Sequence, residues 1–166
     1  MSRRLSAYGL AAAWFALDRV TKALVQASMN QDDVISVVPG FFNLVYTKNR
    51  GIAFSLLSNS ESEWRSFFLI GLTALVIAFV AAILWQTGPR GMAASRLSRV
   101  GLSLVLGGAL GNLYDRLTEG AVTDFLDFYA ASYHWPAFNV ADLGLTIGVG
   151  LILLDLWLSR RREVRI

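Results

Sequence analysis

The sequence predicts an all-α membrane protein with four transmembrane helices and a small β-rich subdomain outside the membrane. The composition is 55% hydrophobic and only 16% charged, and the apolar residues form runs that are long for the core helices of a small soluble protein. Three of these runs contain no charged residue, namely 67–85, 100–114 and 143–154. A chain of 166 residues has room for one domain, so we assign residues 1–166 to a single membrane domain.

The four expected spans cover residues 8–27, 66–85, 97–115 and 139–158, with boundaries accurate to a few residues. A cleavable signal peptide is an alternative for the first span, because a basic start precedes a short apolar run. No small-x-small cleavage site follows at a suitable distance, and the apolar pattern resumes at Ala23. We therefore prefer a retained first helix.

The stretch 31–63 is the only long segment that is expected to face water. Its apolar run 34–38 ends at Pro39-Gly40, which is a turn signal, and apolar and more polar residues alternate from Phe42 to Thr47. This pattern predicts a small, half-buried sheet on the surface of the membrane.

The charged residues indicate which ends of the spans face the cytoplasm. Four spans place both termini on one side, and this side, with the loop 86–99, holds nine basic and two acidic residues. The other side holds six basic and ten acidic residues. Because cytoplasmic segments carry an excess of Arg and Lys, we expect both termini to be cytoplasmic. The same sorting by side explains the basic charge of the chain without a nucleic-acid partner.

Several kinds of catalytic site are excluded by residue type. The chain has no cysteine, one histidine and no His-Glu-x-x-His motif, so we expect no metal and no cofactor. Ser103 and His134 lie on opposite sides of the membrane and cannot form a nucleophile and base pair. A serine–lysine pair that combines Ser55 with Lys22 or Lys48 stays open, since all three lie on the outer side.

Aspartates near the outer ends of the last two spans are the main candidates for catalysis. We interpret Asp124, on the loop between these spans, and Asp142, at the start of the fourth span, as a catalytic pair; Asp127 competes with Asp124. Two carboxylates held close together share a proton, so that one acts as an acid and the other as a base. Such a pair activates water against a carbonyl group and protonates the departing amine, which favours peptide hydrolysis.

Structural explanations exist for the same polar residues. Asn139 and Asp142 have the spacing of a capping box at the start of a helix. Asn112, Asp115 and Arg116 share one face at the end of the third span, where they form either a local Asp–Arg pair or a support for the catalytic site. We expect Asp115 to lie within reach of Asp142.

Two glycine motifs predict close helix packing. They are Gly107-x-x-x-Gly111 in the third span and Gly144-x-x-x-Gly148 in the fourth. Small residues at this spacing let the backbones of two membrane helices approach. The third and fourth spans are therefore expected to touch.

Five segments, taken in order, carry a resemblance to a known family. They are Asp18-x-x-Thr-Lys22, Asn49-Arg-Gly51-Ile-Ala-Phe-Ser55, Gly107-Gly-Ala-Leu-Gly-Asn112-x-x-Asp115-Arg116, Val122-x-Asp124-Phe and Phe138-Asn139-x-Ala-Asp142. The chain resembles lipoprotein signal peptidase, also called signal peptidase II, the aspartyl endopeptidase of the bacterial inner membrane. The resemblance spreads over nearly the whole chain.

The resemblance implies four transmembrane helices, an extracytoplasmic β-cradle and an active site on the extracytoplasmic side. It implies cleavage of a prolipoprotein signal peptide before a diacylglyceryl-modified cysteine, by a dyad that corresponds to Asp124 and Asp142. The family's substrate-contacting or supporting positions correspond to Asn49, Gly51, Asn112, Arg116 and Asn139. Motif positions with structural roles correspond to Asp18, Lys22 and Asp115. Membrane lipid and cyclic peptide inhibitors of the globomycin type are the further implied partners.

Two other functions are compatible with carboxylates at the ends of membrane helices. A small proton- or ion-coupled transporter uses such groups as a relay, and a non-catalytic membrane scaffold needs no dyad. A transporter would lose vesicle transport when the aspartates are replaced, and a scaffold would tolerate Asp124→Asn. We expect a monomer, because no polar or small-residue face remains unexplained.

Overall fold

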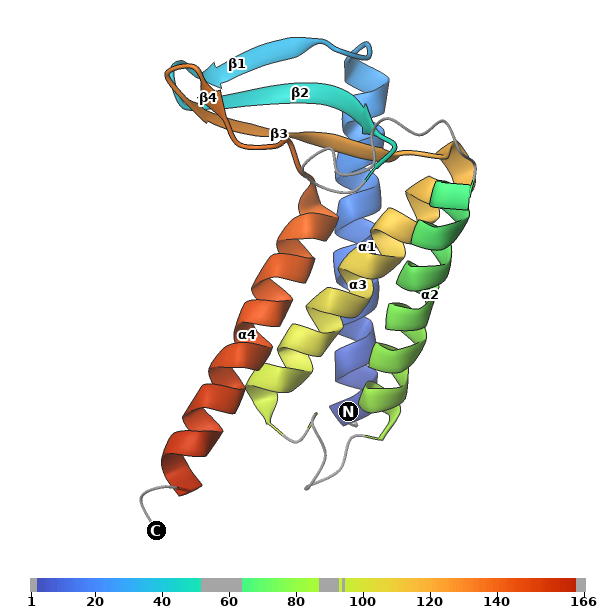
Figure 1. Cartoon of the computed structure of the whole chain (residues 1–166), viewed down its shortest axis with the longest axis vertical. Coiled ribbons are helices and arrows are strands. Elements are labelled where there is room, and N and C mark those ends of the chain that lie inside the picture. Colours follow the sequence, from blue (N-terminus) through green and yellow to red (C-terminus); the bar gives the residue numbers. More distant parts are fainter. Residues whose placement is uncertain (1–2, 52–63, 87–92, 94, 164–166) are drawn as a thin grey trace.

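The described part of the protein consists of four helices and a four-stranded sheet (Figure 1). The computed structural model describes residues 3–51, 64–86, 93 and 95–163. The helices are α1 (Arg3–Ser28), α2 (Trp64–Trp85), α3 (Arg96–Glu119) and α4 (Val140–Glu163). The strands are β1 (Val34–Val38), β2 (Phe42–Asn49), β3 (Val122–Ala130) and β4 (Tyr133–His134).

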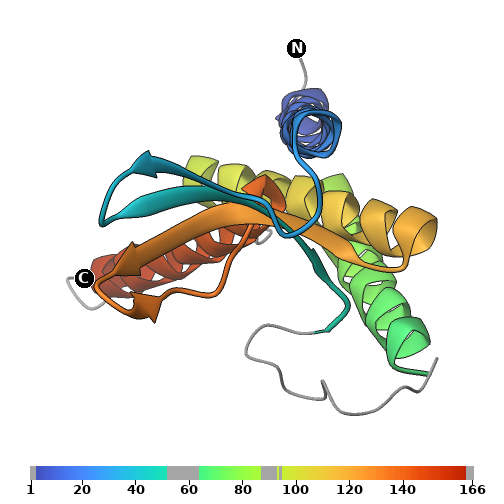
Figure 2. The ribbon, with the colours of Figure 1, turned by 90° about the horizontal axis from the view of Figure 1, so that it is seen from above.

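A helix lies at each of the four expected spans: α1, α2 and α3 cover theirs completely, and α4 begins one residue after the expected start. Helix α3 is the central one, because it packs against each of the other three. The sheet lies across one end of the bundle, while α1 begins and α4 ends at the opposite end (Figure 1). The two hairpin turns of the sheet project past the start of α4, as the view from above also shows (Figure 2).

The sheet differs from the prediction in which segments build it. Strands β1 and β2 come from the expected β-rich stretch, whereas residues 52–63 of that stretch lie outside the described residues. Strands β3 and β4 come from the connection between α3 and α4, where the sequence suggested a loop, so that part of the prediction is wrong. All neighbouring strands are antiparallel in the order β1-β2-β3-β4. Strand β3 forms because β2, far away in the sequence, supplies its hydrogen-bonding partner.

The sheet is fixed to the helices by a small apolar cluster and by a sharp helix end. Phe125 of β3 packs with Val25 and Met29 at the end of α1. Gly120 ends α3 with a φ of 69°, which is a left-handed conformation that glycine adopts at no steric cost. This turn lets β3 begin two residues later, at Val122.

The glycine motifs pack helices together, but not only the expected pair. A Cβ on Gly148 would lie 2.6 Å from the carbonyl oxygen of Gly101 in α3, so the expected contact between α3 and α4 is confirmed. A Cβ on Gly107 would lie 2.6 Å from the carbonyl oxygen of Ala11. Gly107 therefore packs against α1, because α3 lies between α1 and α4 and needs small residues on both sides.

Two described helices are long and apolar enough to cross a membrane, with candidate spans Ser66–Trp85 and Val140–Arg161. Only 17% of each candidate span is buried within the protein, unlike the core helix of a soluble protein. On α2, Phe67, Leu75 and Phe79 expose 71%, 67% and 62% of their surface. An apolar surface of this extent marks a contact with lipid or with another protein.

Candidate active site

Asp124 lies on β3, not on a loop as the sequence suggested. Its backbone is opposite Thr47 of β2 in the antiparallel register, and its side chain is only 2% exposed. Successive side chains of a strand point to opposite faces of a sheet. Phe125 points into the apolar cluster with Val25 and Met29, so Asp124 points to the opposite face. The carboxylate of Asp124 lies beside the start of α4, because Asn139, the residue before that helix, donates to it.

Asp142 lies in the first turn of α4 and is half-buried. Its backbone N–H donates to Asn139 Oδ1 at 3.0 Å, and the Asn139 N–H donates to Asp142 Oδ2 at 3.3 Å. This reciprocal pair confirms the capping box that the sequence predicts. The positive end of the helix dipole also stabilises a negative charge at this position.

Three asparagine side chains hold the two carboxylates in place. Asn139 Nδ2 donates to Asp124 Oδ1 at 2.7 Å, and Asn49 Nδ2 donates to Asp124 Oδ2 at 3.0 Å. Asn112 Nδ2 donates to Asp142 Oδ1 at 2.8 Å. With the Asn139 backbone bond to Asp142, all four carboxylate oxygens accept one hydrogen bond. Asn139 contacts both carboxylates and joins β3 to α4.

The orientation of Asn49 depends on its neighbour in the chain. The backbone N–H of Gly51 donates to Asn49 Oδ1 at 2.9 Å. Because the amide oxygen is engaged there, the amide nitrogen is directed to Asp124. Asn49 and Gly51 therefore form one supporting unit at the end of β2.

The electrostatic environment favours a proton on one member of the pair. Burial, followed by the negative charge of Asp142, raises the pKa of Asp124 from 3.8 to about 7. The hydrogen bonds from Asn49 and Asn139 lower the pKa but do not offset the burial. Near neutral pH, Asp124 is therefore able to hold a proton beside Asp142.

Arg116 places a positive charge next to this pair. Its half-buried guanidinium interacts favourably with the charges of Asp142, Asp124 and Asp115, and its Nη1 donates to the carbonyl oxygen of Asn112 at 3.3 Å. No ion pair within 4.0 Å joins Arg116 to Asp115 among the described residues, so the local Asp–Arg pair considered from the sequence is not formed. Arg116 instead interacts more strongly with the charges of Asp142 and Asp124 than with that of Asp115.

Asp115 belongs to a buried network of charges with α1. Lys22 Nζ lies 2.8 Å from Asp18 Oδ2 and 2.9 Å from Asp115 Oδ2, and all three side chains are fully buried. Arg19 also forms an ion pair with Asp115. Asp115 is therefore paired with cations of α1, because α1 packs against this side of α3. Its approach to Asp142 stays a prediction.

This network touches the candidate dyad through Asn112. Lys22 Nζ donates to Asn112 Oδ1 at 3.2 Å, which leaves the nitrogen of that amide to donate to Asp142. Asp18 Oδ1 accepts the backbone N–H of Ala141 at 2.8 Å, so α1 also fixes the residue before Asp142. Lys22 and Asp18, which correspond to structural motif positions in the resemblance, thus hold Asn112 and the start of α4 in place.

Arg19 is the member of the network that the sequence interpretation missed. It stands next to Asp18, and its guanidinium lies over the ring of Tyr114 at 4.3 Å from the centroid. The available signal was the presence of three charges within one turn of an apolar helix, Asp18, Arg19 and Lys22. A single aspartate cannot balance two cations, so a further carboxylate partner was required.

The competing sites are occupied by other interactions or are not described. Lys22 is held by two carboxylates, and Lys48 forms an ion pair with Glu119; Ser55 lies outside the described residues. Asp127 accepts a hydrogen bond from Asn43 at 2.9 Å and lies 2.9 Å from His134. Within the described residues, no group of three or more His, Cys, Asp or Glu side chains is arranged to hold a metal ion.

Comparisons with known proteins agree with the motifs and the fold. The sequence profile of the family described as "Signal peptidase (SPase) II" matches residues 10–158. The lipoprotein signal peptidase of Solibacter usitatus is 47% identical over 166 residues, which cover 98% of this chain and 97% of that protein. The lipoprotein signal peptidase of Syntrophotalea carbinolica is 45% identical over 142 residues, which cover 86% of this chain and 84% of that protein.

Solved structures of bacterial membrane enzymes have the same fold. One, described as "Bacterial membrane enzyme structure by the in meso method at 2.3 A resolution", superposes with a TM-score of 0.82 at 30% identity and covers 95% of this chain and 91% of that chain. A second, at 1.9 Å resolution, gives a TM-score of 0.75 at 30% identity. Together with the exposed apolar helices, these likenesses identify a membrane protein. The profile match and the relatives over nearly the whole length show that this chain belongs to the signal peptidase II family of peptidases.

Proposed function

We propose that this protein removes signal peptides from prolipoproteins by cleaving the peptide bond before a diacylglyceryl-modified cysteine, and that Asp124 and Asp142 carry out the hydrolysis. The observation that carries the proposal is the arrangement of these two carboxylates on β3 and α4, with every oxygen hydrogen-bonded. The pKa of about 7 for Asp124 supports one acid and one base near neutral pH.

The first step is the attack of water on the scissile carbonyl carbon. Ionised Asp142 takes a proton from the water as its oxygen bonds to that carbon. Protonated Asp124 gives its proton to the carbonyl oxygen, which receives the electron pair of the former π bond and becomes a hydroxyl group. A neutral tetrahedral diol results, with Asp142 protonated and Asp124 ionised.

The second step breaks the carbon–nitrogen bond. Asp142 gives its proton to the amide nitrogen, which leaves with the bonding electron pair as the amino group of the modified cysteine. One hydroxyl group of the diol returns a proton to Asp124 while the carbonyl group forms again. The signal peptide then ends in a carboxylic acid, and the pair has regained its starting protonation.

The supporting residues are assigned by their contacts. Asn112 and Asn139 orient the carboxylates, and Arg116 stabilises negative charge beside them. Asn49 and Gly51 stand at the end of β2 beside Asp124, where the substrate backbone passes in our proposal. A globomycin-type cyclic peptide would occupy the same place and block the entry of water.

The protonation of Asp124 gives a prediction for the pH dependence. Since burial raises the pKa of this acid to about 7, the proton is present below that pH and is lost above it. We expect kcat/KM to fall above about pH 7, approaching tenfold per pH unit. Cleavage rates at low substrate concentration between pH 5 and 9 measure this limb, and a rate that still rises at pH 9 would contradict it.

We further propose four membrane spans in a monomer, with both termini in the cytoplasm of the bacterial cell and the dyad at the outer face of the inner membrane. The charge distribution over the two sides supports this orientation. It also explains how a substrate anchored by its lipid reaches the dyad, because the bond to be cut then lies at the level of the membrane surface.

The sheet gives a test of its proposed position at the membrane surface. Tyr133 and Trp135 are 68% and 53% exposed, beside Phe41 at 56%, and such aromatic residues favour the membrane–water interface. In a chain without cysteine, a fluorophore on Tyr133→Cys is expected to be quenched by brominated lipids. A fluorophore on Gln31→Cys, at the other end of the sheet, is expected to be quenched by aqueous iodide. Equal iodide quenching at both positions would contradict an interfacial sheet.

The experiment that tests the proposed function compares two matched substrates. The purified protein is incubated with a prolipoprotein peptide that carries a diacylglyceryl group on its cysteine, and with the same peptide lacking the lipid. We expect mass spectrometry to find cleavage before the modified cysteine only. Cleavage of both peptides at the same rate, or of neither, would oppose the proposal.

A further inference from the structure

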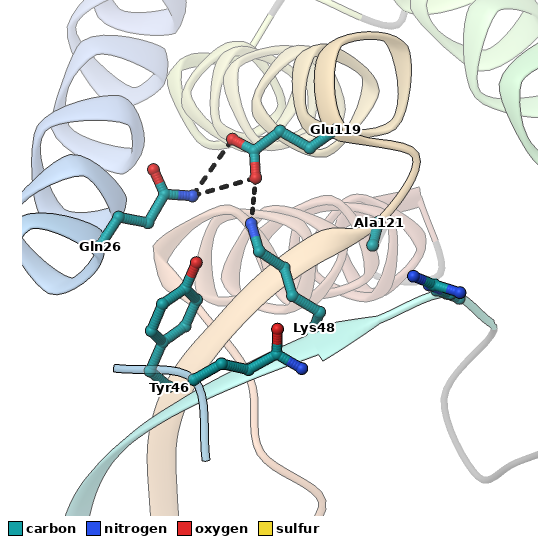
Figure 3. A pocket seen from close by; sticks show the side chains of 7 residues that line it. Gln26, Tyr46, Lys48, Glu119 and Ala121 are labelled. Carbon is teal, nitrogen blue, oxygen red and sulfur yellow. Dashed lines mark hydrogen bonds and ion pairs between the residues drawn. The ribbon is translucent and has the colours of Figure 1, made fainter. Parts of the chain in front are cut away.

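A polar cavity lies beside the end of β2 and the end of α3 (Figure 3). It has a volume of about 500 Å³, and the side chains around it include Gln26, Gln31, Tyr46, Lys48, Arg50 and Glu119. Side chains alternate between the two faces of a strand. Lys48 therefore points into this cavity, while its neighbour Asn49 donates to Asp124 on the other face.

The cavity carries one positive charge that is not balanced within it. Lys48 forms an ion pair with Glu119, and Gln26 Nε2 donates to both oxygens of Glu119 at 3.1 Å (Figure 3). These two charges cancel. Arg50 is exposed, and no ion pair joins it to another residue in the part of the chain that the structure describes. The guanidinium of Arg50 thus remains the net charge of the cavity.

Arg50 also stands next to the candidate dyad in the chain. It lies between Asn49, which donates to Asp124, and Gly51, whose N–H donates to Asn49. An extended peptide advances by about 3.3 Å per residue. A substrate segment that leaves Asp124 toward water and crosses the end of β2 therefore reaches Arg50 within about two to four residues.

We propose that this cavity binds an acidic side chain near the start of the mature lipoprotein, with the Arg50 guanidinium as its partner. This inference rests on the proposed function, in which the signal peptide stays in the membrane and the mature segment runs into water. Arg50 is then a specificity-determining residue, because a carboxylate placed two to four residues after the modified cysteine is attracted and a lysine is repelled.

The test uses substrates that differ at one position. Three diacylglyceryl-modified prolipoprotein peptides carry Glu, Gln or Lys at the third residue after the cysteine, and each is cut by the wild type, Arg50→Gln and Arg50→Glu. For the wild type we expect kcat/KM to be about fivefold higher with Glu than with Lys at low salt. Arg50→Gln should bring this ratio close to one, and Arg50→Glu should reverse it. The ratio is independent of any general loss of activity in a variant.

A control separates binding in the cavity from the general charge of this surface. Asp32 is exposed, precedes β1 and has a φ of 70°, which asparagine tolerates, so Asp32→Asn changes the charge nearby without touching the cavity. Its Glu-to-Lys ratio should stay at the wild-type value. A ratio of one in the wild type while all three peptides are cut would overturn the inference alone, and failure to cut any peptide would overturn the proposed function.

The remaining outcome concerns lipid. The assay is repeated in nanodiscs of phosphatidylcholine with and without phosphatidylglycerol. If Arg50→Gln changes the response to the anionic lipid but leaves the substrate ratio unchanged, the cavity holds a lipid phosphate and the inference is wrong. A substrate ratio that depends on Arg50 in both kinds of nanodisc supports it.

Discussion

Asparagine at position 124 or position 142 is expected to lower kcat for prolipoprotein cleavage by a factor of about 10³. Asparagine has nearly the same size as aspartate, but at position 142 it cannot take a proton from water, and at position 124 it cannot donate one to the carbonyl oxygen. The initial rate of signal-peptide release by the purified variants measures the effect. Size-exclusion chromatography in detergent shows whether they are folded.

Asp127→Asn is the matched control for this result. Asp127 lies on the same strand and is 7% exposed, but it bonds to Asn43 and His134 instead of the candidate dyad. An asparagine there still accepts the hydrogen bond of Asn43, so we expect a rate close to that of the wild type. If Asp127→Asn were inactive and Asp124→Asn active, the catalytic acid would be misassigned.

Lys22→Met is expected to destabilise the fold by about 3 to 5 kcal/mol. Lys22 is fully buried between Asp18 and Asp115, so methionine fills the space but leaves two buried carboxylates without this cation. We expect a lower midpoint of thermal unfolding in detergent, and a loss of activity, because Asn112 also loses the bond that orients it toward Asp142.

Lys48→Met provides the comparison for a partly exposed ion pair. Lys48 pairs with Glu119, and their side chains are 16% and 29% exposed, so water compensates for much of the lost interaction. The expected loss is about 1 kcal/mol or less. Equal destabilisation by the two substitutions would show that burial of the α1 network does not determine its contribution.

The local features of the site could be predicted from the sequence. The spacing of Asn139 and Asp142 specifies a capping box, and Asp18 and Lys22 are one helical turn apart, so both contacts follow from geometry within a single helix. Each of these interactions needs only neighbouring residues. For the same reason the ends of the apolar runs indicated where the helices lie.

The features that depend on distant segments could not be predicted in the same way. The segment around Asp124 forms a strand because β2 pairs with it, and the presence of two acids in a short apolar stretch suggested a loop. Asp115 turns to Arg19 and Lys22 because α1 packs against α3, which no spacing within α3 reveals. In both cases, contacts between distant segments of the chain overrode the structure that the local sequence favours.

The proton on Asp124 is the central claim, and infrared difference spectroscopy tests it most directly. The C=O stretching band of a protonated carboxylic acid is recorded between pH 5 and 9 for the wild type and for Asp124→Asn. We expect a band that the substitution removes and that disappears from the wild type around pH 7, the raised pKa of Asp124. A band that is absent from the wild type at pH 5, or unchanged in Asp124→Asn, would contradict the assignment of Asp124 as the acid of the pair.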